Sequence, residues 1–133
     1  RLMNLLNMSD GAYLAIHSLA LIAGRQPKRL TVKHLALELD ASQAHLAKVF
    51  QKLGKAGLVE SIRGPAGGFV LKRKPDEISF LDIYEIMEGQ VTQGDCPLGK
   101  ENCAFDSCIF TSEFNRISAD LYNTYRRIKL SDF

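Results

Sequence analysis

Residues 42–71, SQAHLAKVFQKLGKAGLVESIRGPAGGFVL, decide the fold class of this chain. The apolar residues of the first half recur at helical spacing: Leu46, Val49, Phe50 and Leu53. Ser42 can cap a helix before them, and Gly57 can end one after them. From Leu58 the period changes to two, and the glycine-rich segment 64–68 reverses the chain into a second strand. The stretch therefore predicts a helix followed by a two-stranded hairpin.

Two more helices are expected upstream of this stretch. Ser9 and Asp10 can accept hydrogen bonds from a helix start, and apolar residues recur at helical spacing from there to Gly24. Thr31 can cap a short helix that ends before Asp40. Three helices followed by a hairpin are the order of a winged helix-turn-helix. We therefore predict a mainly α fold, with a two-stranded wing and a long C-terminal helix.

Charge is distributed unevenly along the 133 residues. Residues 1–75 contain twelve Lys and Arg against four Asp and Glu, whereas residues 76–133 contain five against eleven. A basic region built on a helix-turn-helix favours nucleic acid as its partner. We predict a winged helix-turn-helix DNA-binding domain over 1–75, and a cysteine-loop sensor and dimerisation region over 76–133.

The predicted DNA contacts lie on the third helix and on the wing. The candidates are Ser42, Gln43, Ala44, His45, Lys48 and Lys52 on the helix, and Arg63, Gly67 and Gly68 on the wing. A recognition helix presents donors and acceptors to the major groove near its N-terminal end, where Gln43 and His45 lie. Arg63 could enter the minor groove. The expected partner is double-stranded DNA with a palindromic operator.

The cysteines suggest a metal centre. Cys96, Cys103 and Cys108 are separated by six and then four residues, and they are the only cysteines in the chain. Their odd number and the lack of a secretory leader argue against a disulfide framework and favour the bacterial cytoplasm. The centre could be an iron-sulfur cluster or a structural zinc site completed by Asp10 or a histidine, and the thiols could instead form a redox switch. An enzyme is not expected, because all three histidines lie in the predicted DNA-binding helices.

The last part of the chain predicts a dimerisation helix. Ser79 and Asp82 form a capping-box pattern for a helix that ends at Gly89. After Phe110, apolar residues recur along one side of a helix of some twenty residues: Phe114, Ile117, Leu121, Tyr125 and Ile128. A long apolar stripe favours a homodimer, although the helix could fold back on its own domain. No apolar run is long enough to span a membrane.

Two runs of sequence, read together with the cysteines, resemble the Rrf-type family of bacterial iron-sulfur transcription regulators. They are LAKVFQKLGKAGLV at 46–59 and IRGPAGGF at 62–69. The likeness extends over almost the whole chain. It implies a dimer in which three cysteines and one further residue of each subunit hold a cluster, 4Fe-4S or 2Fe-2S, whose state governs DNA binding.

The fourth ligand separates the branches of this family. IscR-like members use a histidine shortly after the third cysteine, but no histidine occurs here beyond His45. In an NsrR-like, nitric-oxide-sensing repressor the ligand is an aspartate at the start of the first helix, donated by the other subunit, and Asp10 occupies the matching position. The resemblance is therefore closer to the NsrR-like branch, with nitric oxide or redox and iron status as the expected signal. Asp10 could also serve only as part of a helix cap.

Overall fold

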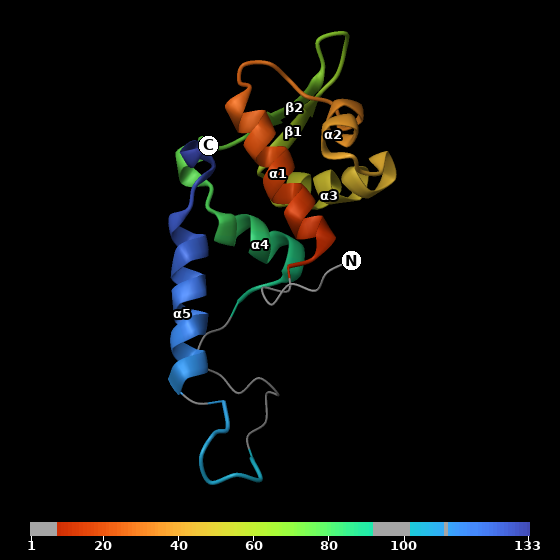
Figure 1. Ribbon diagram of the computed structural model, residues 1–133. Coiled ribbons are helices and arrows are strands. Elements are labelled where there is room, and N and C mark those ends of the chain that lie inside the picture. Colours follow the sequence, from red (N-terminus) through yellow and green to blue (C-terminus); the bar gives the residue numbers. More distant parts are fainter. Residues whose placement is uncertain (1–7, 92–101, 111) are drawn as a thin grey trace.

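The structure is a computed structural model that describes residues 8–91, 102–110 and 112–133. Its elements follow in the order α1 (Asp10–Gly24), α2 (Val32–Leu39), α3 (Gln43–Lys55), β1 (Val59–Ile62), β2 (Gly68–Leu71), η1 (Pro75–Glu77), α4 (Phe80–Glu88), α5 (Ser112–Arg127) and η2 (Leu130–Asp132). Figure 1 shows α1 in the middle of the body, with α2, α3 and the wing on one side and α4 and α5 on the other. The predicted winged helix-turn-helix with a C-terminal helix is confirmed.

The helices begin where the sequence predicts them, because a hydroxyl side chain precedes each of the first four. Ser9, Thr31, Ser42 and Ser79 each accept a hydrogen bond from the backbone N–H three residues further on. Such a cap satisfies a donor that has no partner within the helix. The carboxylate of Asp82 accepts a hydrogen bond from the N–H of Ser79 at 3.0 Å, which completes the predicted capping box.

One hydrophobic core joins the regions before and after residue 75. Leu19 of α1 and Leu46 and Leu53 of α3 are fully buried in it. Ile83 of α4 and Leu130 of η2 belong to the same cluster and are also fully buried. The packing of the predicted DNA-binding region therefore depends on residues near the end of the described chain.

The wing is a short antiparallel hairpin attached to α3. Val59 pairs with Leu71, and Ile62 pairs with Gly68. The ring centroid of Phe69 in β2 lies 4.4 Å from that of Phe50 in α3. This aromatic contact fixes the base of the wing against the helix that precedes it.

Helix α5 is shorter than predicted and ends at Arg127, so Ile128 lies just beyond it. The carbonyl of Ile128 accepts a hydrogen bond from the N–H of Phe80 at 3.0 Å, and Lys129 forms a β-bridge with Ser79. These bonds use backbone groups that a longer helix would need, which explains the earlier end. No helix within the described ranges is long and apolar enough to cross a bilayer.

Candidate nucleic-acid interface

Helix α3 presents its polar face to solvent. Its exposed residues are Gln43, Ala44, His45, Ala47, Lys48, Gln51, Lys52, Gly54 and Lys55. The opposite face is held in the core by buried Leu46, Val49, Phe50 and Leu53. Because the apolar face fixes the rotation of the helix about its axis, the predicted DNA-reading side chains are available to a partner.

Two glycines at the tip of the wing are required by the backbone itself. A Cβ added to Gly67 would lie 2.4 Å from the carbonyl oxygen of Ile62, which is a severe clash. Gly68 has a φ of +144°, and an added Cβ there would lie 2.8 Å from the carbonyl oxygen of Leu30. These close approaches give Gly67 and Gly68 a structural role beside their predicted role at DNA. Arg63 lies exposed before the turn.

The wing is also tied to the loop before α2, which the sequence reasoning did not anticipate. The N–H of Phe69 donates to the carbonyl of Leu30 at 2.8 Å, and these two residues form a β-bridge. The guanidinium of Arg29 donates to the carbonyl of Ala66 at 3.3 Å. No local pattern could have revealed this pairing, because Arg29 and Ala66 are 37 residues apart.

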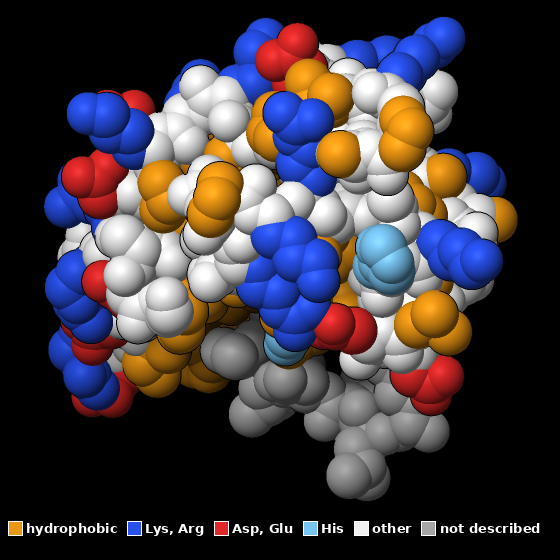
Figure 2. Space-filling model, turned by 90° about the horizontal axis from the view of Figure 1, so that it is seen from above, with side chains coloured by type: hydrophobic (Ala, Val, Ile, Leu, Met, Phe, Trp, Pro, Cys, Tyr) orange, Lys and Arg blue, Asp and Glu red, His pale blue; other side chains and the backbone are white. Residues whose placement is uncertain are grey.

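Figure 2 shows a face of the molecule on which basic side chains are interspersed with apolar, neutral and acidic ones. Lys and Arg side chains are spread over this face, and a histidine lies beside a group of them.

Glu38 forms an ion pair with Arg25. The hydrogen bond from Arg25 holds the pKa of the Glu38 carboxyl below its usual value. Glu38 therefore stays ionised, and its charge is balanced by its partner.

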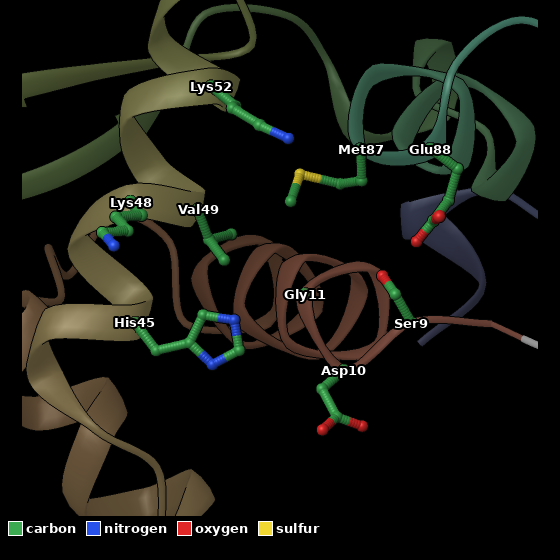
Figure 3. Close-up of a pocket in the computed structure, with 9 residues that line it drawn as sticks. All are labelled: Ser9, Asp10, Gly11, His45, Lys48, Val49, Lys52, Met87 and Glu88. Atoms are coloured by element: carbon green, nitrogen blue, oxygen red, sulfur yellow. The ribbon is translucent and has the colours of Figure 1, made fainter.

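The start of α1 meets helix α3 in a hollow of about 430 Å³ (Figure 3). Its lining includes Asp10 and Gly11 of α1, His45 and Lys48 of α3, and Met87 of α4. A Cβ added to Gly11 would lie 3.3 Å from Cε of Met87 and 3.8 Å from Nε2 of His45. The imidazole of a predicted DNA-reading residue therefore lies close to the first turn of α1, beside the predicted cluster ligand.

The predicted cluster ligands are not brought together within the described part of one chain. Asp10 is exposed in the first turn of α1, and Figure 3 shows its carboxylate directed away from Met87 and Glu88. Cys103 and Cys108 are exposed free thiols, and Cys96 lies outside the described residues. Residues 8–91, 102–110 and 113–133 contain no group of three or more His, Cys, Asp or Glu placed to hold a metal.

The predicted dimerisation stripe divides into two halves. Phe114 and Ile117 are 56% and 55% exposed, whereas Leu121, Tyr125 and Ile128 are partly buried. The ring of Tyr125 lies 5.7 Å from that of Tyr84 in α4. The chain itself thus covers the second half of the stripe and leaves the first half open.

With this geometry established, comparison with known proteins identifies the family. Residues 8–133 match Rrf2, described as an iron-dependent transcriptional regulator. The chain belongs to the Rrf2 family. An Rrf2 protein is a DNA-binding transcriptional regulator and not an enzyme, so this chain is a regulator of that kind.

Individual relatives agree with this assignment. A helix-turn-helix-type transcriptional regulator of Aquifex aeolicus is 28% identical over 127 residues, which cover 93% of this chain and 88% of the relative. IscR of Aliivibrio salmonicida is 35% identical over 95 residues, or 71% of this chain and 56% of that protein. The solved structure of CymR, the global cysteine regulator of B. subtilis, superposes with a TM-score of 0.73, covers 98% of this chain and 95% of CymR, and is 24% identical. At that identity the likeness to CymR concerns the Rrf2 fold alone.

Proposed function

We propose that this Rrf2 protein is a dimeric repressor whose binding to a palindromic operator is controlled by an iron-sulfur cluster held by Cys96, Cys103 and Cys108. Asp10 of the second subunit is proposed as the fourth ligand, and nitric oxide or the redox and iron status of the bacterial cytoplasm as the signal. The observation that carries the proposal is the cysteine loop in a family described as iron-dependent.

The donor set suits such a cluster. Thiolates are soft ligands that hold iron-sulfur clusters well, and the described thiols of Cys103 and Cys108 are exposed rather than packed in the core. No histidine follows Cys108 to serve as an IscR-like ligand, whereas Asp10 is exposed at the start of α1. A carboxylate is a harder and weaker ligand for iron, so a cluster that it completes would leave one iron open to a small molecule.

A second subunit is proposed because the apolar surfaces of one chain complement each other. An apolar groove of about 560 Å³ is lined by residues of α1, α4, α5 and the last turn, among them Tyr13, Ile16 and Phe80. Tyr125 and Ile128 form one wall of this groove. Phe114 and Ile117 lie on the same stripe as that wall but nearer the start of α5, so their own chain cannot easily fold them into the groove. A second copy can cover both surfaces.

The hollow at the start of α1 offers a route from ligand to DNA. Asp10 and Gly11 are adjacent, and Gly11 lies near the imidazole of His45. A change in what holds Asp10 would move the first turn of α1 and, with it, the packing of His45 on the recognition helix. This route requires no rearrangement of the core.

The test is the visible absorption spectrum, with iron and sulfide content, of protein purified without oxygen. We expect a brown protein with iron and sulfide near stoichiometry, and we expect nitric oxide to bleach the spectrum and release operator DNA. Asp10→Ala should alter the spectrum and the nitric oxide response. Asp106→Ala, which removes an exposed carboxylate between Cys103 and Cys108, is the matched control and should change neither.

Other outcomes separate the alternatives. A colourless protein containing zinc would overturn the cluster and favour a structural zinc site. A metal-free protein whose DNA binding responds to a thiol oxidant would favour a redox switch. A brown protein in which Asp10→Ala changes nothing would retain the cluster and exclude Asp10 as its ligand.

A further inference from the structure

A basic groove lies between the loop that joins α1 to α2 and the tip of the wing. It measures about 550 Å³ and is lined by Lys28, Arg29, Thr31 and His34 on one side and by residues 65–67 of the wing on the other. The side chains of Lys28, Arg29 and His34 are all exposed. The groove is distinct from the polar face of α3 and from the hollow beside Asp10.

The chemistry of the groove suits an anion. Three of its side chains are basic, and no carboxylate is among the described residues that line it. The carboxyl of Glu38 is close enough to Lys28 and His34 to interact with them electrostatically, but it is ion-paired with Arg25. An incoming negative charge would therefore meet cations whose field is not cancelled within the groove.

The donors of the groove are partly oriented in advance. Arg29 donates from Nη1 to the carbonyl of Ala66, and a guanidinium has further N–H groups that can bind a phosphate oxygen. Nδ1 of His34 lies 3.1 Å from Oγ1 of Thr31, which leaves Nε2 as the ring nitrogen to face a ligand. Arg29 is thus held against the wing, and His34 is oriented by the hydroxyl of Thr31, which also caps α2.

From this geometry we infer that the groove binds a phosphate of the DNA backbone, with Lys28, Arg29 and His34 as its contacts. The inference rests on the DNA-binding function of the module. When a recognition helix occupies the major groove and a wing occupies the neighbouring minor groove, the strand that separates the two grooves must pass between helix-turn-helix and wing. The basic groove lies in that interval, between α2 and the wing tip. The same phosphate would fasten the wing to the loop through Arg29.

The experiment measures binding of the complete protein to a fluorescent mixed-sequence DNA duplex by anisotropy at several salt concentrations. Each phosphate contact contributes about 0.9 to the slope of log K against log salt. Because the groove is inferred to hold one phosphate, we expect the combined Lys28→Ala and Arg29→Ala variant to reduce the slope by about 0.9, and Lys28→Ala alone to reduce it by part of that amount. The Arg29–Ala66 hydrogen bond stays intact in Lys28→Ala, so that variant tests the phosphate contact apart from any effect on the wing.

The matched control is the combined Arg126→Ala and Arg127→Ala variant, which removes two adjacent exposed cations from the last turn of α5. It should leave the slope unchanged although the net charge falls by the same amount. All substituted side chains are exposed, and circular dichroism of each variant checks that it is folded.

Two results would overturn the inference. The first is a slope and affinity of Lys28→Ala equal to those of the unaltered protein, together with a double variant that matches the α5 control. In that case the unaltered protein still binds DNA, and only the groove assignment fails. The second is an unaltered protein that binds no duplex in any cluster state, which would overturn both the groove and the DNA-binding function.

Discussion

Helices α3 and α5 are both amphipathic, yet they use their apolar faces differently. The face of α3 is buried by its own chain, with Leu46 and Leu53 fully inaccessible to solvent. The face of α5 is covered only in its second half, and Phe114 and Ile117 remain more than half exposed. An apolar stripe in the sequence therefore predicts burial but does not specify which chain provides the cover.

The largest effect is expected at Leu53, where the apolar face of α3 is fully buried. Leu53→Ala leaves a cavity among fully buried residues and should lower the free energy of unfolding by about 2–5 kcal/mol. Urea denaturation at a fixed protein concentration measures this change. Gln51→Ala, exposed on the same helix, is the control and should remain within about 0.5 kcal/mol of the unaltered protein. Equal effects of the two substitutions would mean that α3 is not anchored as described.

The open half of α5 can be tested with a charge. Ile117→Asp should weaken the proposed dimer at least about a hundredfold, because each of two subunits would lose about 1.5–3 kcal/mol of apolar burial, and 1.4 kcal/mol is about tenfold in affinity. Sedimentation equilibrium measures the change. Asn123→Asp adds the same charge to the opposite side of α5 and should leave the dimer intact. An undisturbed Ile117→Asp dimer would show that another surface joins the subunits.

A smaller effect is expected within α3. Gly54 lies in the helix, and among the described residues an added Cβ would meet no neighbouring atom within 4 Å. Gly54→Ala should therefore raise the free energy of unfolding by about 0.5–1 kcal/mol. Gly67→Ala makes the contrasting substitution, since its Cβ would clash with the backbone of Ile62, and it should destabilise the protein. Thermal denaturation of both variants checks the sign, and a stabilised Gly67→Ala would contradict the geometry of the wing tip.

The smallest expected effect concerns the covered half of α5. Burial, and then the charge of Glu88, raise the pKa of Tyr84, and burial followed by the neighbouring tyrosines raises that of Tyr125. The unfolded chain releases these protons first, near pH 10, so their contribution to stability is complete below about pH 10 and is lost as the pH rises through the folded-state values. Tyrosinate absorbance should show two groups that titrate late, and Tyr84→Phe should remove one of them. Identical titration of native and unfolded protein would contradict this.

The sequence predicts most of the fold because its signals are local. Caps such as Ser42 and Ser79 act within three residues, and the apolar spacing of α3 specifies which face is buried. The wing follows from a change of period and a glycine-rich turn. These patterns correctly predict where the first four α-helices begin and the order of helices and strands along the chain.

The contacts that the sequence did not predict are long-range. Three contacts join segments that share no local pattern. They are the hydrogen bond from Arg29 to Ala66, the approach of His45 to Gly11 and the β-bridge between Ser79 and Lys129. The last of these also explains why α5 ends before Ile128. The DNA-contact candidates of α3 could be proposed from the sequence because they lie on one helix, whereas the basic groove is visible only when two distant segments are placed side by side.

The burial of Leu130 has a consequence for biosynthesis. Leu130 is fully buried, and its N–H donates to the carbonyl of Ile78 at 3.0 Å, so the core around α1 lacks a component until this residue is available. A ribosome makes the chain from its N-terminus, and all three cysteines have been translated before Leu130 is added. The winged helix-turn-helix therefore cannot complete its packing before the three cysteines have been added to the growing chain.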